Sequence, residues 1–484
     1  MKKPFSFEQL AAKNELEIKA TFKRVAEKTS PSWQEREAEK KKAAELACAL
    51  EKRLGGIAKV CFVGSAARDT GLRGDRDIDL FVTFPKSMKR DEIVKKTFDA
   101  AKKSINANWV TRYAEHPYLQ GVAGGFKVEV IPCFRIEQDS ELKSAVDRTP
   151  LHMEYLQKHL SDDQKKDVRV LKQFLKNAGL YGAELEVQGF SGLVCEYLIL
   201  NYHSLLGLMI HTADNWRFPI VVDLEGKYYG EEEKLREKFK DNQNGFILVD
   251  AIDKNRNAAA ATSKTNVSKF ICLCRGFLKR PGEEFFFRKE KKHSKTELLA
   301  AVERRSSTLY LVKSPRPKEL VEDVFFPQLR KSAASIAKQL VLADFILFDF
   351  DFFADSKHSF LLFELEEDLL PAVKRVQGPP VDDGDACGSF VEGVRKHEKT
   401  GKIIRGPYVE EGRIFADKLR EERSAKEFLK KILKKPEKYA VASHVAKSFK
   451  KAQFFEAEKI VSACSTEESL QKLGDYLLRK EWWF

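Results

Sequence analysis

Residues 62–85 read FVGSAARDTGLRGDRDIDLFVTFP, and this stretch decides how the rest of the chain is interpreted. An apolar strand expected at 60–63 stops at Gly64-Ser65, and the Ala-Ala-Arg that follows predicts the opening of a helix. Backbone N–H groups and the Ser65 hydroxyl gather at such a junction. The pattern therefore predicts a place where a phosphate can bind.

Asp77 and Asp79 follow at the head of a second apolar run, residues 80–84. Because residues i and i+2 of a strand face the same side, the two carboxylates project together from the start of a buried strand. An Asp-x-Asp beside a glycine is more often a turn or a helix cap when it stands alone. Here two like charges enter a hydrophobic strand, where they need a partner. A divalent cation is the simplest partner.

A third carboxylate is offered by FKVEVIPCF at 126–134. Alternation places Glu129 on the face opposite the apolar residues, and Pro132 indicates that the strand lies near a sheet edge or ends there. Alone, Glu129 would be a solvated residue of an amphipathic strand. Beside Asp77 and Asp79 it completes a set of three metal ligands.

The Gly-Ser, the Asp-x-Asp and the third acid together resemble the nucleotidyltransferase superfamily of DNA polymerase β and the poly(A) polymerases. The closer resemblance is to the archaeal, class I CCA-adding enzymes, the tRNA nucleotidyltransferases that build the 3′ CCA end. It is continuous from about residue 59 to about residue 264 and thins beyond. The similar stretches, in the family's order, are YAEHPY (113–118), SAVDRTPLH (144–152), LKQFLKNAGLYGAE (171–184), GFSGLVCE (189–196), FFPQL (325–329) and GPP (378–380).

The resemblance implies template-independent addition of CCA to tRNA that lacks all or part of this end, from CTP and ATP, with release of pyrophosphate. Two Mg²⁺ ions would be bound by Asp77, Asp79 and Glu129, the first two bridging both ions. The residues that match the family's nucleotide-contacting positions are Ser65, Arg68, Thr149, His152, Lys172, Tyr181 and Arg256.

Arg256 lies in VDAIDKNRNAA, residues 249–259, which is similar to the family segment that contributes an arginine beside the incoming base. An arginine suits this work because its planar fork presents several donors in a fixed geometry. In one respect the chain departs from the family pattern, which has Glu then Asp on the first strand and Asp on the neighbouring strand. We hypothesise that the shorter side chain of Asp77 is compensated by the longer one of Glu129.

Length and pattern predict a multidomain α+β protein. The expected domains are a nucleotidyltransferase head with a small mixed sheet (1–147), a helical central domain that binds nucleotide and RNA (148–265), and a tRNA-binding α+β body with a helical, basic tail (266–484). Periodicity predicts helices at 7–29, 32–54, 90–104, 189–210, 320–341, 369–376, 427–438 and 446–459, strands at 109–113, 308–312, 345–352 and 360–365, and a loop at 378–389.

The formal net charge of +13 favours a polyanionic partner such as RNA. No apolar run reaches the length of a membrane span, and the start of the chain is charged, so we expect a cytoplasmic protein without a membrane partner. Among eight cysteines there is no Cys-x-x-Cys pair, and Cys272-x-Cys274 lies in an apolar helical pattern, which predicts no zinc site. The oligomeric state, including a homodimer, is left open.

Two alternatives accompany the CCA-adding interpretation. One is a related template-independent polymerase such as a poly(A) polymerase, and the other is an RNA-binding protein whose catalytic head is inactive. All three carboxylates and the Gly-Ser are present, which disfavours the inactive protein. The nucleotide preference separates the two polymerases, because CCA addition takes CTP and then ATP and stops.

Overall fold

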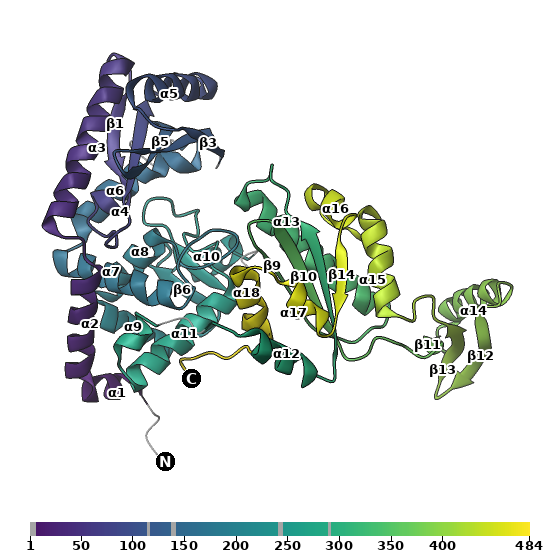
Figure 1. The fold of residues 1–484 in the computed structure, drawn as a ribbon. Coiled ribbons are helices and arrows are strands. Elements are labelled where there is room, and N and C mark those ends of the chain that lie inside the picture. The colour runs from purple at the N-terminus through teal and green to yellow at the C-terminus, as the bar shows by residue number, and fades with distance from the viewer. Residues whose placement is uncertain (1–5, 114–116, 137–141, 241–244, 289–291) are drawn as a thin grey trace. The chain divides into compact units, whose positions relative to one another are not determined.

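The computed structural model describes residues 6–113, 117–136, 142–240, 245–288 and 292–484. The chain forms two compact units, residues 1–289 together with 482–484, and residues 290–481 (Figure 1). Helices and strands occur in both units, which confirms the α+β class. The three-domain boundaries stay a prediction, although in this division residues 266–289 belong with the first unit.

The first unit opens with three helices, α1 (Phe7–Lys13), α2 (Glu15–Thr29) and α3 (Trp33–Leu54). The helix expected at 7–29 is divided at Asn14, whose side chain does not cap α2 but donates to the Leu278 carbonyl oxygen at 3.1 Å. Helix α3 begins at the reciprocal hydrogen bonds of Ser32 and Glu35 and ends at Gly55, whose φ of 59° suits glycine. The capping signals in the sequence thus place both ends of α3.

A five-stranded mixed sheet follows, with the order β1-β2-β5-β4-β3. Its strands are β1 (Lys59–Val63), β2 (Asp77–Phe84), β3 (Val110–Tyr113), β4 (Pro117–Ala123) and β5 (Phe126–Phe134). Within this sheet β2 and β5 pair in parallel, and the other described neighbours pair antiparallel. Strand β5 does not end at Pro132, because its pairing with β2 continues to Phe134. The pairing of β5 with β4 stops at Val130, so the proline lies past the last β4 pair.

Helices α3 and α5 (Arg90–Ser104) cover one face of this sheet and bury its apolar residues. Ile78 and Leu80 of β2 and Val128 and Val130 of β5 all lie in that core. Residues of the opposite parity on these strands must therefore face the other side of the sheet. That side carries the three acids.

The rest of the first unit is mainly helical around a core that contains α7, α8, α9 and α11. The elements are α6 (Arg148–His159), α7 (Asp162–Asn177), α8 (Gly192–Tyr202), α9 (Leu205–Asn215), α10 (Glu232–Lys238), α11 (Lys264–Lys279), β6 (Ile220–Asp223) and β7 (Phe246–Val249). Trp483, from the end of the chain, is only 4% exposed in this core. A Cβ at Gly276 of α11 would lie 2.6 Å from the Trp483 carbonyl oxygen, so the two segments are in close contact.

The prediction of a single helix at 189–210 is wrong, because this segment forms two helices, α8 and α9. They are separated where His203 adopts a left-handed φ of 64° and the Ser204 hydroxyl caps the start of α9. Within the described residues, no individual helix has the length and apolar composition to cross a membrane. Helices α8 and α9 satisfy these two criteria only when taken as a pair, and they are bent by 87°.

The second unit contains a four-stranded sheet of order β14-β8-β10-β9 and a three-stranded sheet of order β11-β13-β12. Its elements are α12 (Lys295–Glu303), β8 (Thr308–Pro315), α13 (Glu322–Leu342), β9 (Leu347–Ala354), β10 (His358–Leu365), β11 (Val373–Pro380), α14 (Gly384–Glu398), β12 (Ile403–Glu410), β13 (Arg413–Leu419), α15 (Ala425–Lys434), α16 (Ser443–Phe449), β14 (Gln453–Glu456), α17 (Lys459–Ala463) and α18 (Glu467–Leu477).

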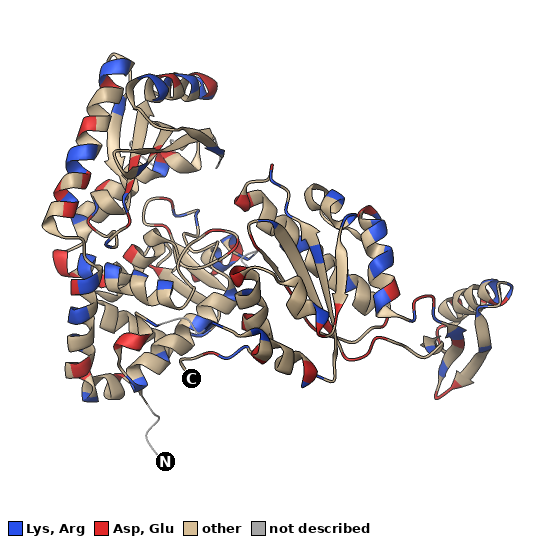
Figure 2. Ribbon diagram, viewed as in Figure 1, with Lys and Arg blue, Asp and Glu red and all other residues tan. Residues whose placement is uncertain are grey.

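Three expectations for this unit are wrong. No helix forms at 369–376: residues 373–376 begin strand β11, which pairs with β13 about forty residues later. The loop predicted at 378–389 contains the end of β11 and the start of α14, and the helix predicted at 446–459 contains strand β14. Helix α15 confirms the helix expected near 427–438. Basic residues line α15, whereas basic and acidic residues alternate along α3 (Figure 2).

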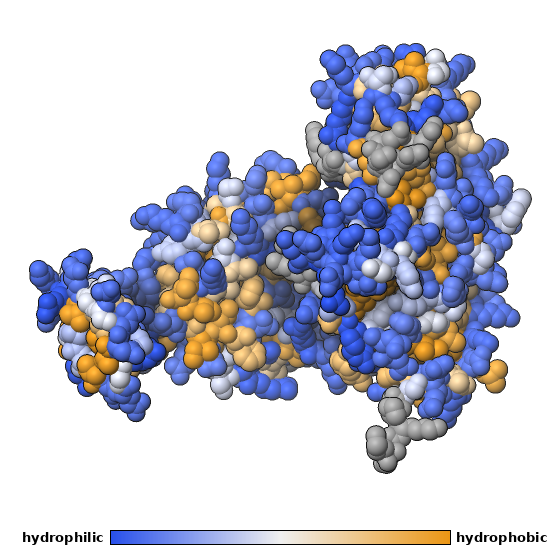
Figure 3. Space-filling view, turned by 180° about the vertical axis from the view of Figure 1, so that it is seen from behind, coloured by the Kyte–Doolittle hydropathy of each residue, from blue (hydrophilic) through white to orange (hydrophobic). Residues whose placement is uncertain are grey.

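The face seen in Figure 3 is mostly hydrophilic, and its apolar side chains gather in several patches. Several large apolar residues are more than half exposed in the second unit, among them Leu342 and Phe348 at the end of α13 and the start of β9. Val341 and Ile346 of the same segment are also more than half exposed.

Candidate active site

Asp77, Asp79 and Glu129, which we call the acidic face, lie on the same side of the two parallel strands. The register places Asp79 directly beside Glu129 and Asp77 beside Lys127. The next residues along this side, Phe81 and Ile131, pack with Met153 of α6 in a small second core. The acids therefore lie at the edge of an apolar layer, as the strand alternation predicts.

Gly64 and Asp79 are in close contact across strands β1 and β2. Val63 is in register with Asp79, and Gly64 has a φ of 84°. A Cβ at position 64 would collide with the Asp79 carboxylate. Glycine is therefore required here for both its conformation and its small size.

The helix predicted after Gly64-Ser65 is a single turn, α4 (Gly64–Ala67). It ends because Asp69 adopts a left-handed φ of 57°. The Asp69 carboxylate is held there by Arg36 at 3.2 Å and by Arg169 at 3.3 Å. Ser65 thus sits in a tight turn, without the aligned amides of a long helix.

The acidic face concentrates negative charge. Burial, followed by the charges of Glu129 and Asp77, raises the pKa of Asp79 to about 7. Lys127 Nζ lies 3.6 Å from Asp77 Oδ1 and 3.5 Å from Glu129 Oε1. Burial lowers the pKa of Lys127, but the neighbouring carboxylates outweigh burial and raise it overall. The sequence analysis missed Lys127, although it faces the same side as Glu129 two residues away.

Three carboxylates on one face are a suitable donor set for Mg²⁺, which prefers oxygen ligands. Burial and then repulsion from Glu129 and Asp77 raise the pKa of Asp79, and a bound cation would favour its charged form. Gln120 Nε2 donates to Glu129 Oε1 at 2.6 Å, and Lys127 lies between Glu129 and Asp77. As placed, no three Asp, Glu, His or Cys side chains of the described residues converge closely enough to hold one ion. By the type of their donor atoms, the three carboxylates fit Mg²⁺.

Glu196 of α8 is a fully buried carboxylate that the sequence analysis missed. Arg68 Nε donates to its Oε1 at 2.9 Å, and Thr70 Oγ1 donates to the same atom at 2.5 Å. Burial raises the pKa of Glu196, but Arg68 and then Lys172 outweigh it and lower the pKa overall. Glu196 thus pairs directly with Arg68 and is influenced by the charge of Lys172, two of the predicted nucleotide-contacting cations.

Lys172 is only 2% exposed, and its ammonium donates to the Thr70 carbonyl oxygen at 2.9 Å. Burial lowers its pKa. A Cβ at Gly192, the first residue of α8, would lie 3.5 Å from Tyr181 Oη and 3.6 Å from Lys172 Nζ. The structure therefore brings Lys172 and Tyr181 together at the beginning of α8.

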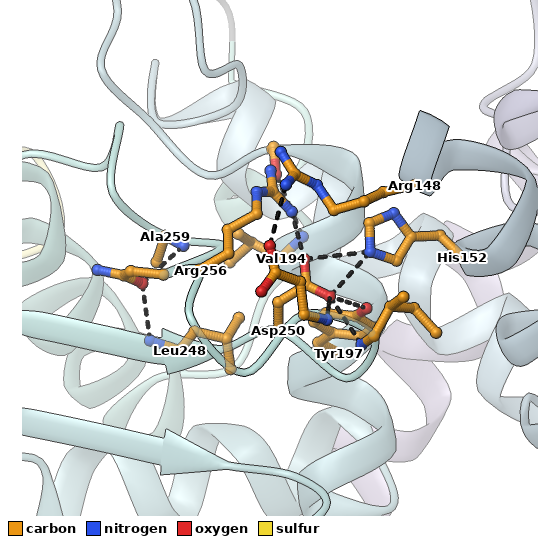
Figure 4. A network of polar contacts seen from close by, with 12 residues as sticks. Arg148, His152, Val194, Tyr197, Leu248, Asp250, Arg256 and Ala259 are labelled. Atoms are coloured by element: carbon orange, nitrogen blue, oxygen red, sulfur yellow. Dashed lines mark hydrogen bonds and ion pairs between the residues drawn. The ribbon is translucent and has the colours of Figure 1, made fainter. Parts of the chain in front are cut away.

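His152 and Arg256 converge on Asp250, which follows strand β7 (Figure 4). His152 Nε2 lies 2.9 Å from Asp250 Oδ1, and Arg256 Nη1 donates to Asp250 Oδ2. Tyr197 Oη also donates to Oδ1, at 3.3 Å. Burial raises the pKa of Asp250, but His152 and then Arg256 outweigh it and hold the pKa well below its usual range.

The predicted site residues thus fall into three groups within the first unit. The acidic face forms one, Arg68, Lys172 and Tyr181 near Glu196 form the second, and His152 and Arg256 at Asp250 form the third. Consecutive residues of α8, Glu196 and Tyr197, support the second and third groups. Thr149 lies one turn before His152 on α6, next to Arg148, which pairs with Asp253 at 3.0 Å.

A mixed sheet with paired acids on one strand, a third acid on its parallel neighbour and a Gly-Ser turn is the arrangement of a nucleotidyltransferase. Family models agree, matching residues 42–152 (nucleotidyltransferase domain), 166–287 (tRNA nucleotidyltransferase, second domain) and 305–456 (CCA-adding enzyme, C-terminal domain). The chain belongs to the family of CCA-adding enzymes.

Individual relatives support this assignment over most of the chain. The CCA-adding enzyme of Methanocaldococcus jannaschii is 35% identical over 409 residues, which cover 83% of this chain and 87% of that protein. The CCA-adding enzyme of Methanothermobacter thermautotrophicus is 33% identical, and the match covers 84% of this chain and 87% of that protein. The CCA-adding enzyme of Archaeoglobus fulgidus is 35% identical, and the match covers 79% of this chain and 83% of that protein.

Solved structures similar to this chain include the Cid1 poly(U) polymerase with bound Mg 3′-dATP. It is 14% identical, with a TM-score of 0.43, and the match covers 55% of this chain and 98% of that one. A cytoplasmic RNA terminal U-transferase is 13% identical, with a TM-score of 0.44, and the match covers 56% of this chain and 100% of that one. The family assignment depends on the sequence matches.

Proposed function

We propose that this protein completes the 3′ end of tRNA by adding C, C and A in turn, without a nucleic-acid template, from CTP and ATP. The observation that carries the chemistry is the acidic face, where three carboxylates gather beside the Gly64-Ser65 turn. The sequence matches to CCA-adding enzymes support tRNA as the acceptor. The proposed reaction joins the tRNA 3′-oxygen to the α-phosphorus of the nucleotide and releases pyrophosphate.

Asp77, Asp79 and Glu129 would bind two Mg²⁺ ions. When bound, such ions activate an attacking hydroxyl and neutralise charge on a departing pyrophosphate. The three carboxylates themselves orient this site, because β2 and β5 fix their spacing and Gly64 packs against Asp79. Lys127 must move from between Asp77 and Glu129, or share them, when the carboxylates take a cation.

The nucleotide is expected to lie between the acidic face and the start of α8. Arg68 and Lys172 supply positive charge for a triphosphate, and the Ser65 and Tyr181 hydroxyls supply hydrogen bonds to phosphate or ribose. Thr149 and His152 lie on α6 at the side of Arg256, which we assign to the incoming base. Helix α15 and the other basic elements of the second unit would contact tRNA phosphates.

The protein is expected to work in the cytoplasm, and a homodimer is compatible with the proposal. The test is incorporation on three tRNA transcripts that end before the CCA, after its first C and after its second C. CCA addition predicts C, C and A respectively, followed by termination. Open-ended addition of A would instead support the poly(A) polymerase alternative. No incorporation by a folded protein that binds tRNA would support the inactive RNA-binding protein.

A further inference from the structure

We infer that Asp250 is a positioning residue for base selection, one that aims the Arg256 guanidinium without touching the nucleotide. This inference rests on the proposed function. Asp250 is fully buried, whereas the Arg256 side chain is 34% exposed. Asp250 therefore has no surface of its own to offer a substrate, and any effect it has on selection must pass through the groups that it holds.

The contacts of Asp250 come from three separate parts of the fold (Figure 4). His152 reaches it from α6, Tyr197 from α8 and Arg256 from its own loop. The backbone N–H of Ile252 also donates to Asp250 Oδ1, at 2.8 Å. Both carboxylate oxygens are thus engaged, so the carboxylate cannot rotate without breaking several hydrogen bonds at once.

The loop that carries Arg256 is fixed on either side of this contact. The Arg256 N–H donates to the Asp253 carbonyl oxygen at 3.0 Å, and Arg256 O accepts from the Asp250 N–H at 3.1 Å. Asn257 Oδ1 accepts from the N–H groups of Leu248 and Ala259, both at 2.9 Å. Because the backbone is held in this way, the Asp250 contact decides mainly the direction of the side chain.

Arg256 donates one guanidinium nitrogen to Asp250, and this hydrogen bond restricts the orientation of the guanidinium. The exposed edge of the guanidinium can then form hydrogen bonds with a base. Such a fixed fork can distinguish a base that offers acceptors in the right places from one that offers a donor. An arginine that is free to rotate would accept several bases with similar energy. Loss of Asp250 should therefore lower selectivity more than the rate for the correct nucleotide.

The test measures single-turnover incorporation of CTP, UTP and ATP on the three tRNA transcripts. Asp250→Asn keeps the size of the side chain but removes its charge and places an amide against the Arg256 donors. We expect the preference for CTP over UTP to fall about tenfold, a coupling of about 1.4 kcal/mol, within the range for residues that share one network. Arg256→Ala should lower the preference at least as far.

The double variant Asp250→Asn/Arg256→Ala separates a positioning role from general damage. If Asp250 acts through Arg256, the double variant has the selectivity of Arg256→Ala alone. Independent losses that multiply would overturn the inference. Asp253→Asn is the matched control, because it disturbs the same loop at the Arg148 pair but leaves the Asp250–Arg256 contact. An equal loss of preference in this control would also overturn the inference.

Tyr197→Phe carries the test if Asp250→Asn does not fold. It removes one donor to Asp250 Oδ1 and keeps the ring, so a smaller loss of preference for CTP is expected, and an unchanged preference counts against the inference. Wild-type protein provides the separate check on the proposed function. If the wild type does not add CCA, the proposed function fails. If it does and all Asp250 variants keep full selectivity, only the role of Asp250 fails.

Discussion

The acidic face and the two buried carboxylates, Glu196 and Asp250, use the same functional group in opposite electrostatic settings. Burial, and then the charges of Glu129 and Asp77, raise the pKa of Asp79 to about 7. Glu196 and Asp250 are more deeply buried, yet their pKa values are lowered, because arginine, lysine or histidine side chains surround them. The difference shows that like charges surround Asp79, whereas positively charged side chains offset the burial of Glu196 and Asp250.

This contrast assigns different work to the two kinds of site. A half-buried cluster of like charges is unstable by itself and favours binding of an external cation. A carboxylate already paired with internal cations instead fixes the positions of those cations. Substitutions should therefore separate the two: loss of activity without loss of stability at the acidic face, and loss of stability at the buried carboxylates.

The largest effect is expected for Asp79→Ala. Loss of a central metal ligand should lower the rate of CMP addition by about a thousandfold or more, since each ~1.4 kcal/mol of transition-state stabilisation is worth tenfold. Binding of tRNA, measured by filter retention, should change little. Asp75→Ala is the control, because Asp75 is a nearby, partly exposed acid that pairs with Lys176 at 3.7 Å. Near-normal turnover of Asp79→Ala would remove the acidic face from the mechanism.

Glu196→Gln should act in the opposite way and destabilise the protein. Removing one partner of a buried ion pair leaves the charges of Arg68 and Lys172 uncompensated, which typically costs about 3–5 kcal/mol. Urea denaturation of the variant should therefore show an earlier transition than wild type. Asp79→Asn, compared in the same experiment, should be as stable as wild type or more so. Equal losses of stability in the two variants would contradict the proposed difference between the acidic face and the buried carboxylates.

A smaller effect is expected from exchanging acids within the acidic face. Asp77→Glu and Glu129→Asp should each lower single-turnover CMP addition, because each shifts a carboxylate by one methylene in a site that tolerates only about 0.5 Å of misplacement. The double variant should regain about tenfold over the product of the single losses, a coupling typical of residues in one site. Magnesium titrations of all four proteins check whether the gain follows ion binding. Strictly additive losses would mean that the two positions do not compensate.

The smallest effect concerns pH in the presence of EDTA. The pKa of Asp79 is about 7 in the folded protein and 3.8 as an ordinary value. Between these values the folded state keeps a proton that the unfolded chain has lost, so the free energy of unfolding falls as pH rises from about 4 to 7. Asp79→Asn should therefore have a higher melting temperature than wild type at pH 7, where each kcal/mol of unfolding free energy corresponds to about 2–4 °C. Near pH 4 the two proteins should have the same melting temperature.

Asp250 has the opposite linkage, because its pKa is lowered in the folded protein. Its contribution to stability is present above the ordinary pKa of an aspartate and is lost as pH falls through the lower folded value. Thermal melts of Asp250→Asn and wild type should therefore differ most at neutral pH and converge in acid. A difference that grows on acidification would contradict the assigned partners.

The sequence predicted the local geometry of the acidic face well. Strand alternation and the Asp-x-Asp spacing need only neighbouring residues, and the structure places Asp77, Asp79 and Glu129 on one side as expected. What the sequence could not show are partners that meet only in the folded chain. Glu196 meets Arg68 across 128 positions and Asp250 meets His152 across 98, and nothing local marks either carboxylate.

The errors in the fold have the same physical origin. Strand β11 has no strong strand pattern of its own and forms because β13 supplies its hydrogen bonds. Helix α4 stops after one turn because Arg36 and Arg169 hold Asp69 in a left-handed conformation. In each case a contact with a distant segment overrides the local preference.

The position of Trp483 has a consequence for the way the chain is made. This residue fills part of the core of the first unit, yet the ribosome reaches it only after residues 290–481. During synthesis, the apolar surface around Gly276 and Phe285 therefore remains exposed until the whole second unit has left the ribosome. Nascent chains paused in that interval carry an incomplete core, and chaperones that recognise exposed apolar surface would find it there.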